Sequence, residues 1–205
     1  MSERQPTLRE RQRSETRHAI QAHAVRLFTE RGYDAVPVTD VAEAAGVSAM
    51  TVYRHFPTKE DLVLVDQPTG LIAERVAASP TTWPVPHRVG GALVAAATAL
   101  TVGAEAAADR RFLLDCLRLM VATPALRARH LEREYAMQQA VVEALGIDPA
   151  DAEAAFPARA AVSACLAALH TALTRWAEDD GGTELPELIA RALTASFGPD
   201  VLRAA

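Results

Sequence analysis

Apolar residues recur along most of the chain with the spacing of an amphipathic α-helix. In the first long segment, from about residue 9 to 30, the positions i, i+4, i+7 and i+8 hold Ile20, Ala24, Leu27 and Phe28. Gly32 follows where a helix commonly ends in a left-handed conformation. No segment shows the alternation of apolar and polar residues that indicates a β-strand. The pattern predicts an all-α fold.

Two short helices, separated by Gly46, are predicted next, over residues 39–45 and 49–56. Thr39 and Ser48 are expected to be their N-cap residues, because a hydroxyl at that position accepts a bond from the first turn. Such a pair of short helices with a tight turn between them predicts a helix–turn–helix arrangement.

The remainder of the chain is also predicted to be helical, with Pro and Gly marking the breaks. Thr58 is expected to cap the first of these helices and Asp148 the longest one. Pro124 and Pro149 stand where a first helical residue is expected. The expected helices cover residues 59–66, 69–78, 87–108, 110–122, 124–145, 149–178 and 186–197.

Charges are spread unevenly over the 205 residues. The formal net charge is −5, but residues 1–59 carry +2 and residues 60–205 carry −7. A basic N-terminal end on an acidic body favours contact of that end alone with a polyanion. A gradient of solvated surface charge is the alternative interpretation.

Composition excludes several classes of protein. The sequence has no run of about 18 apolar residues, so no transmembrane helix is expected. It also lacks an apolar segment after Met1, so no signal peptide is expected. Cys116 and Cys165 lie 49 positions apart, which argues against a disulfide scaffold and against a zinc ribbon. We therefore expect a reduced, cytoplasmic protein without membrane contact.

Motifs of catalysis and metal binding are also missing from the sequence. It contains no G-x-S-x-G, no phosphate-binding or dinucleotide-binding glycine motif and no H-E-x-x-H. The six histidines are scattered, and His18 and His23 stand five positions apart instead of the three or four that align two ligands on a helix face. The sequence predicts neither an enzyme nor a cofactor or metal site.

Residues 39–59, TDVAEAAGVSAMTVYRHFPTK, carry the most informative pattern. The small core between the two short helices is expected to consist of Val41, Ala42, Val47, Val52 and Phe56. The rest of the second helix has no carboxylate, which suits approach to phosphate groups. A helical hairpin within a larger core is the alternative.

This block resembles the TetR family of bacterial transcriptional regulators. The resemblance rests on Gly32-Tyr33 and on the pattern T-x-x-x-x-A-A-G-V-S-x-x-T-V-Y-R-H-F-P-x-K-E-D-L, which runs from Thr39 to Leu62. It implies a three-helix DNA-binding domain over residues 1–58 and a helical effector-binding and dimerisation domain over 59–205. In this family the second short helix enters the major groove of DNA.

The resemblance also implies roles for individual residues. Thr39 binds a phosphate, Lys59 holds the DNA backbone, and Ala49, Met50 and Arg54 are the variable base readers. Ala49 and Met50 offer only apolar contact, for instance to a thymine methyl group. The remaining contacts to bases or backbone are expected from Ser48, Thr51, Tyr53 and His55.

The N-terminal arm is rich in arginine. In some members of the family such an arm contacts the adjacent minor groove or backbone, which makes Arg13 and Arg17 candidate DNA contacts. The alternative is a frayed segment whose arginines pair with Glu10 and Glu15.

The body resembles the C-terminal domain of regulators of the mycofactocin-regulator type. The matching segments are FPTKEDLVL, TPALRAR at 123–129, LGIDP at 145–149 and Leu-Pro at 185–186. The resemblance implies an effector pocket among the middle helices, with acyl-CoA as the effector of some relatives. It also implies a homodimer through the last two long helices, at about 149–178 and 186–197.

The residues themselves also favour a dimer. Segment 149–178 has one stripe of large apolar residues for its own subunit, which runs from Val162 to Trp176. A second, flat stripe suits close approach of a partner helix and consists of Ala161, Ala164, Ala168 and Ala172. A monomeric bundle with the same helices internal is the alternative.

Candidate pocket residues lie on the middle helices, and ordinary core packing is the alternative for each. Asp115 and Arg118, three positions apart, form either a structural ion pair or a ligand anchor. The main candidates are Trp83, Leu93, Ala97, Phe112, Asp115, Cys116, Arg118, Leu119, Tyr135 and His170. Further candidates are Leu100, Met120, Arg127, His130 and Met137.

With the resemblance, the sequence predicts a homodimeric repressor that binds a palindromic double-stranded DNA operator. A small, largely apolar effector is expected to release it. The alternatives are an activator of the same family and a helical dimer that binds small molecules but not DNA.

Overall fold

The computed structural model describes residues 7–64, 69–103, 107–148 and 151–203. Within these ranges every regular element is helical and no strand occurs, so the all-α prediction is confirmed there. The elements are α1 (Leu8–Arg31), α2 (Val38–Ala44), α3 (Ala49–His55), the 3₁₀ helix η1 (Glu60–Leu62), α4 (Thr69–Ala78), α5 (Val85–Thr101), α6 (Ala107–Ala122), α7 (Pro124–Ala144), α8 (Ala152–Glu178) and α9 (Leu185–Phe197).

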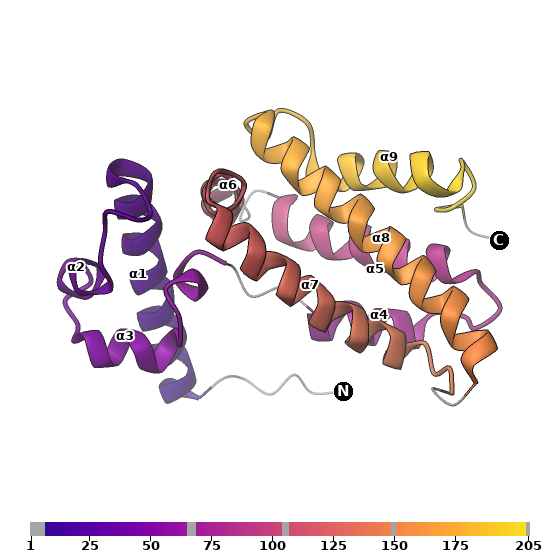
Figure 1. The fold of residues 1–205 in the computed structure, drawn as a ribbon, viewed down its shortest axis with the longest axis horizontal. Helices are drawn as coiled ribbons and strands as arrows, with labels where there is room; N and C mark the ends of the chain where they lie inside the picture. Colours follow the sequence, from indigo (N-terminus) through magenta and orange to yellow (C-terminus); the bar gives the residue numbers. More distant parts are fainter. Residues whose placement is uncertain (1–6, 65–68, 104–106, 149–150, 204–205) are drawn as a thin grey trace.

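The first three helices, which we call the N-terminal unit, are built on the apolar face of α1. α2 packs against α1, and α3 packs against α2 (Figure 1). Gly32 ends α1 with a φ of +90°, a conformation that glycine adopts without strain, as predicted. The residues at the centre of this unit are all nearly inaccessible to solvent: Ile20, Phe28, Val41, Val52 and Phe56.

Only one of the two expected hydroxyl caps forms. α2 begins at Val38 after Pro37, so Thr39 is its second residue and not its N-cap, and no side chain caps this helix. The proline at the boundary fixes an extended entry into the helix and sets its start one residue earlier than predicted. Ser48 does cap α3, by accepting a hydrogen bond from the Thr51 N–H (3.1 Å).

The chain after α3 forms a single 3₁₀ turn, η1, instead of the helix predicted over 59–66. Residues 65–66 lie outside the described ranges. The Thr58 N–H donates to Asp61 Oδ2 (3.1 Å), and the Asp61 N–H donates to Thr58 Oγ1 (3.3 Å). This reciprocal pair resembles a capping box, but the N-cap of η1 is Lys59 and no side chain caps the turn, so the prediction that Thr58 is the cap is wrong.

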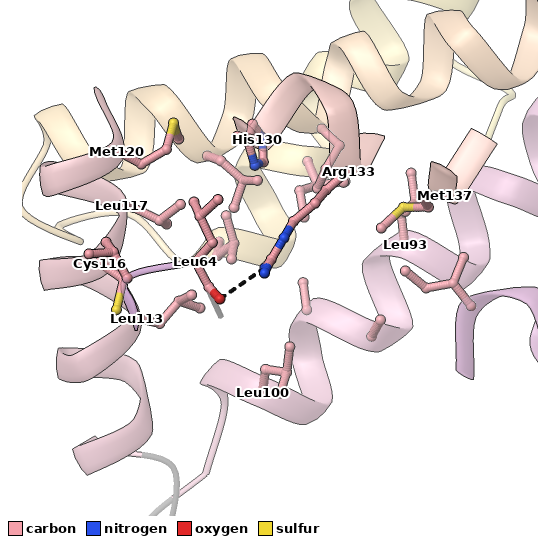
Figure 2. Close-up of a pocket in the computed structure, with 18 residues that line it drawn as sticks. Leu64, Leu93, Leu100, Leu113, Cys116, Leu117, Met120, His130, Arg133 and Met137 are labelled. Atoms are coloured by element: carbon pink, nitrogen blue, oxygen red, sulfur yellow. Dashed lines mark hydrogen bonds between the residues drawn. The ribbon is translucent and has the colours of Figure 1, made fainter. Parts of the chain in front are cut away.

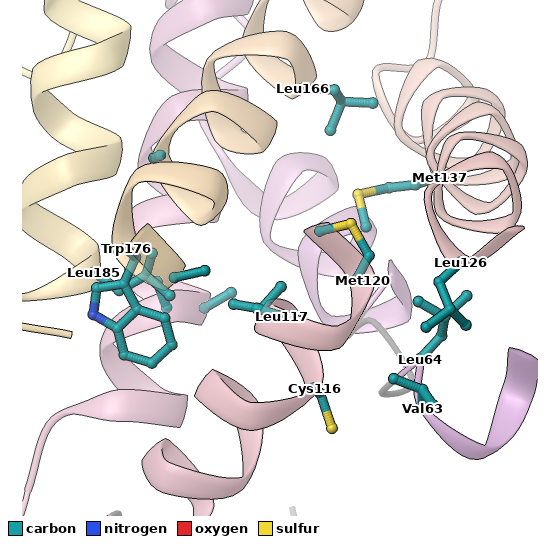
Figure 3. Close-up of a cluster of buried hydrophobic side chains, with 14 of the residues drawn as sticks. Val63, Leu64, Cys116, Leu117, Met120, Leu126, Met137, Leu166, Trp176 and Leu185 are labelled. Atoms are coloured by element: carbon teal, nitrogen blue, oxygen red, sulfur yellow. The ribbon is translucent and has the colours of Figure 1, made fainter. Parts of the chain in front are cut away.

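Helices α4 to α9, which we call the body, surround one apolar core. α8 lies centrally and contacts α5, α6, α7 and α9 (Figure 1). Trp176 from α8, Met120 from α6 and Met137 from α7 are each at most 1% exposed and lie in this core (Figure 3). Their size and number explain why the body holds together around α8.

Several helix boundaries in the body differ from the prediction: α5 begins at Val85 instead of 87 and α6 at Ala107 instead of 110, and two further differences have a clear local cause. α5 ends at Thr101, not at 108, because Val102 is extended and Gly103 has a φ of +125°. α8 begins at Ala152 with Asp151 as its N-cap, which accepts from the Ala154 N–H (3.1 Å), so the cap is not Asp148. Pro149, expected at the first helical position, lies outside the described residues.

By length and composition alone, α8 is long and apolar enough to cross a membrane. It packs instead against four neighbouring helices, and its buried residues include Val162, Leu166 and Trp176. A core helix of a helical bundle satisfies the same length and composition test.

Candidate nucleic-acid interface and ligand cavity

The outward face of α3 carries exposed side chains that a packed helix would bury. Met50 is 76% exposed and Tyr53 49%, and Arg54 is exposed as well. Val52 points inward and is fully buried. The helix has no acidic residue, so nothing on this face repels a phosphate group.

The two hydroxyls at the start of α3 pair with each other. Ser48 Oγ and Thr51 Oγ1 lie 2.9 Å apart, and Ser48 also caps the helix. Ser48 is exposed, whereas Thr51 and Ala49 are half-buried. Both hydroxyls are therefore held in place at the N-terminal end of α3.

A basic groove runs between the first half of α1 and the end of α3. Its walls are formed by Arg9, Gln12, Arg13, Thr16, Arg54 and His55. Burial lowers the pKa of His55 below its ordinary value, and the charges of Arg13, Arg54 and Arg17 lower it further. The groove thus concentrates positive charge beside the exposed face of α3.

Two of the cations that the sequence assigned to DNA make contacts inside the N-terminal unit. Arg17 Nη1 donates to the carbonyl of His55 (2.6 Å), and its guanidinium lies over the Phe56 ring (4.3 Å). Lys59 Nζ donates to the carbonyl of Tyr33 (2.6 Å) and lies 4.4 Å from that ring. These contacts hold the C-terminal end of α3 and the segment that follows it, a role that charge alone did not reveal.

Thr39 lies apart from α3, on α2, and its side chain is exposed. The structure therefore brings most of the predicted DNA contacts to one side of the N-terminal unit, with α3 and the groove at its centre. Arg17 and Lys59 belong to the same region but support it from within.

A cavity of about 110 Å³ lies in the body, bounded by α4 to α9 and the segment after η1 (Figure 2). Of the main candidates, Leu93, Ala97 and Cys116 line it, and so do the further candidates Leu100, Met120, His130 and Met137. The sequence missed the remaining lining residues, which are Val63, Leu64, Ile72, Ala96, Leu113, Leu117, Arg133, Leu169, Leu173, Leu185 and Ile189.

Several of the main candidates pack elsewhere. Trp83 contacts His87 edge to face with ring centroids 4.5 Å apart, and the ring centroids of Phe112 and His18 lie 5.6 Å apart. Tyr135 is 65% exposed, and it lies outside the cavity.

The two polar residues predicted for the pocket, Asp115 and Arg118, form an ion pair with each other. Arg118 Nη1 and Asp115 Oδ1 lie 3.1 Å apart, and Arg118 also pairs with Asp180. Neither lines the cavity, and neither does the partly buried Leu119 or Arg127, which donates to the Val121 carbonyl.

Two polar side chains, His130 and Arg133, reach the wall of the cavity. Arg133 donates to the carbonyl of Leu64 (2.9 Å; Figure 2) and to Asp61 Oδ1 (2.7 Å). Burial raises the pKa of Asp61, but hydrogen bonds from Thr58 and Arg133 outweigh it and keep the pKa below its ordinary value. The cavity wall is thus bonded directly to η1.

His130, Glu134 and His170 form a second polar group, on α7 and α8. Burial lowers the pKa of His130 to about 4, and the charges of His170 and Arg133 add to this effect. Burial raises the pKa of Glu134 to about 7. The spacing of four between His130 and Glu134 was available in the sequence, but His170 comes from another helix and does not line the cavity.

Comparison with known proteins agrees with the resemblance noted from the motif. The family described as bacterial regulatory proteins, tetR family, matches residues 20–65, and the MftR C-terminal domain matches residues 101–196. The HTH-type transcriptional regulator TcmR of Streptomyces glaucescens is 31% identical over 137 residues, which are 65% of this chain. The match spans 60% of TcmR, less than two thirds of its length.

Solved structures show the same architecture. NalD, the secondary repressor of the MexAB-OprM multidrug efflux pump in Pseudomonas aeruginosa, has a TM-score of 0.57 and 25% identity, and the match covers 90% of this chain and 95% of NalD. FadR of Thermus thermophilus, a repressor solved in complex with lauroyl-CoA, has a TM-score of 0.51 and 24% identity, and the match covers 92% of this chain and 97% of FadR. This likeness supports a shared fold and carries no conclusion about the ligand. The chain belongs to the TetR family, whose members are transcriptional regulators and not enzymes.

Proposed function

We propose that this protein is a homodimeric, cytoplasmic repressor that binds a palindromic DNA operator through α3 and is released by a small apolar effector. The observation that carries this proposal is the exposed, acid-free face of α3 beside the basic groove. The proposed division is a DNA-binding domain over residues 1–58 and an effector-binding and dimerisation domain over 59–205.

Side chains on this face divide into two roles. Arg54 and Met50 are the exposed residues that reach base edges, Arg54 by hydrogen bonds and Met50 by apolar contact. Tyr53, His55 and Arg13 contact phosphates, which fix the position of the helix without reading sequence. Ser48, Thr51 and Thr39 add polar contacts from the N-terminal ends of α3 and α2, next to the half-buried Ala49.

Arg17 and Lys59 are positioning residues in this proposal. Their bonds to the carbonyls of His55 and Tyr33 hold the segment at the end of α3 in its orientation, and their positive charges favour the nearby DNA backbone.

A dimer through α8 and α9 gives two copies of α3 and therefore two half-sites. The alanine stripe expected to meet the partner is only partly available, because Ala168 and Ala172 are buried within the subunit. An outward stripe without charge takes its place in the proposal, and it consists of Phe156, Ala160, Ser163, Ala167 and Thr171.

An effector in the cavity has a direct route to α3. Val63 and Leu64 line the cavity, and Asp61 joins the same segment to Arg133. A ligand that moves this wall changes the position of η1, which contacts both α1 and α7. The effector favours release from DNA only to the extent that it binds the DNA-free conformation more tightly than the DNA-bound conformation.

The cavity also limits the effector. Its volume of about 110 Å³ is below that of a cavity of roughly 150 Å³ that holds benzene. A larger molecule needs the flexible side chains of Met120 and Met137 to move, and the mostly apolar wall favours an apolar one.

An electrophoretic mobility-shift assay with DNA from upstream of the gene tests the proposal. The assay is repeated over a range of salt concentrations. The wild type is expected to bind a palindromic site, with affinity that falls steeply as salt rises. Tyr53→Ala is expected to weaken binding at least about tenfold, whereas Arg26→Ala, which removes an exposed cation paired with Glu30 elsewhere on α1, leaves it unchanged.

Absence of salt-sensitive binding to any duplex would contradict the proposal and favour the second candidate, a helical dimer that binds small molecules only. The cavity supports that candidate, because it exists independently of α3. Transcription from the bound promoter in vitro separates a repressor from an activator.

A further inference from the structure

Three side chains that are potential metal ligands converge between α7 and α8. The Nε2 atom of His130 lies 3.7 Å from Oε1 of Glu134, and Nδ1 of His170 lies 3.9 Å from the same oxygen. All three atoms lie within 4.8 Å of one another. His130 and Glu134 are four positions apart on α7, so both point from one face of that helix toward α8.

None of these three atoms has a hydrogen-bond partner among the described residues, although all three are buried. His130 as a whole is only 4% exposed. Their separations are too long for hydrogen bonds, which need about 2.7–3.2 Å. Buried polar atoms are rarely left without a partner, so a group that all three can share is expected between them.

We propose that His130, Glu134 and His170 bind one divalent transition-metal ion of the zinc class. Two imidazole nitrogens and one carboxylate oxygen are a common protein ligand set for Zn²⁺, at about 2.0–2.2 Å from the ion. Ligand atoms around a tetrahedral ion at that distance lie about 3.3 Å apart, so small rotations of the three side chains complete the site.

A single ion accounts for all three partnerless atoms at once, which a hydrogen bond between two of them does not. Arg133, whose charge acts on His130, already bonds through its guanidinium to Asp61 and to the Leu64 carbonyl. His170 is about one-third exposed, which gives an ion access from solvent. Water supplies the fourth ligand of an open site of this kind.

Metal titration of the full chain in the absence of DNA tests this site independently of the proposed function. Chelator-treated protein is titrated with Co²⁺, whose visible absorption reports low-coordinate nitrogen and oxygen ligation, and Zn²⁺ is then added in competition. The expected result is about one Co²⁺ per chain, displaced by Zn²⁺, which binds more tightly in such sites.

The variants test whether these residues are the ligands. Glu134→Gln keeps the shape of the side chain and is expected to weaken Co²⁺ binding at least about tenfold, and His170→Gln, on the more exposed ligand, is expected to do the same. Glu132→Gln is the matched control, because Glu132 lies on the same helix but is 66% exposed and pairs with Arg129, and it should bind like wild type.

Thermal unfolding with and without Zn²⁺ gives a second readout. Because an ion that binds only the folded state raises the melting temperature, Zn²⁺ should stabilise the wild type and Glu132→Gln but not Glu134→Gln. Circular dichroism of the metal-free variants shows whether each has folded. The proposal is overturned if wild type binds no Co²⁺, or if folded Glu134→Gln binds it as tightly as wild type does.

Discussion

The proposed functional residues of the N-terminal unit face solvent, whereas those of the body face the interior. On α3 the proposed contacts face solvent, and an exposed Met50 and Tyr53 stand out because packing alone would bury them. In the body the proposed contacts face inward, where Leu93 or Met137 looks like any core residue. An outward site is therefore visible in the pattern of residue types, whereas an inward one is defined by the distances between helices.

The two regions are joined by a small set of contacts. Asp61 of η1 bonds to Arg133 of α7, and His18 of α1 contacts Phe112 of α6. η1 is also the segment that continues into the cavity wall at Val63 and Leu64. Substitutions in this junction are expected to change the free energy of unfolding more than substitutions within either site do.

Asp61→Asn is the largest expected perturbation. It removes the negative charge of the Asp61 carboxylate, which is only 8% exposed and pairs with Arg133, and this is expected to lower the free energy of unfolding by about 3–5 kcal/mol. Urea denaturation measures it. The pKa of Asp61 is lowered in the folded state, so its contribution is complete above about pH 4 and is lost as pH falls further.

The matched control is Asp200→Asn, which breaks an ion pair with Arg203 whose two side chains are both 77% exposed. A change of about 0–1 kcal/mol is expected there. Equal effects of the two substitutions would show that the junction is no more important than a surface ion pair.

Arg54→Ala and Tyr53→Phe separate reading from positioning on α3. If Arg54 bonds to guanine through two donors, its loss relaxes the preference at one base position by about 1–3 kcal/mol. Tyr53→Phe is expected to weaken binding to all operator sequences by the same factor, because a contact to phosphate does not depend on the base. Binding to a set of single-base operator variants measures both, and an unchanged preference in Arg54→Ala would limit Arg54 to phosphate contact.

The sequence predicted the N-terminal unit well because its signals are local. Gly32, Ser48 and the buried Val52 each act within a few residues of their own position, and all three behave as predicted. The inward roles of Arg17 and Lys59 depend on carbonyls 38 and 26 positions away, His55 and Tyr33. Nothing local distinguishes such a cation from one that faces DNA.

The cavity and the histidine–glutamate cluster were harder to predict for the same reason. Leu64, Leu113 and Ile189 come from segments far apart in the chain, and only the packing of the body brings them to one wall. His170 meets Glu134 across two helices, at a relative rotation that periodicity does not give. The helix boundaries, in contrast, were mostly within a few residues, because Pro and Gly act where they stand.

Ala97→Leu tests the inward site alone. The added methylene groups enter existing space in the cavity, so the free energy of unfolding is expected to change by about 1 kcal/mol or less. DNA binding should persist while release by an apolar effector is lost. Ala77→Leu, at an exposed position on α4, is the control and should respond to the effector normally. A normal response in Ala97→Leu would place the effector outside this cavity.

The smallest expected effect is a pH dependence of DNA binding through His55. In the free protein the pKa of His55 is below its ordinary value, because burial and the surrounding arginines disfavour the imidazolium. Nearby DNA phosphates favour the imidazolium, so the pKa rises on binding and the complex takes up a proton. Affinity should therefore increase as pH falls from about 8 to 6, by tenfold at most for each unit that the pKa rises.

Fluorescence anisotropy of a labelled operator at constant ionic strength measures this slope. His55→Gln should bind with an affinity that no longer depends on pH in that range, whereas His87→Gln, in the body beside Trp83, should keep the wild-type slope. A slope that survives in His55→Gln would assign the proton to another group. A slope lost only in His55→Gln would place a phosphate at the end of α3, because only a new negative charge there reverses the effect of the three arginines.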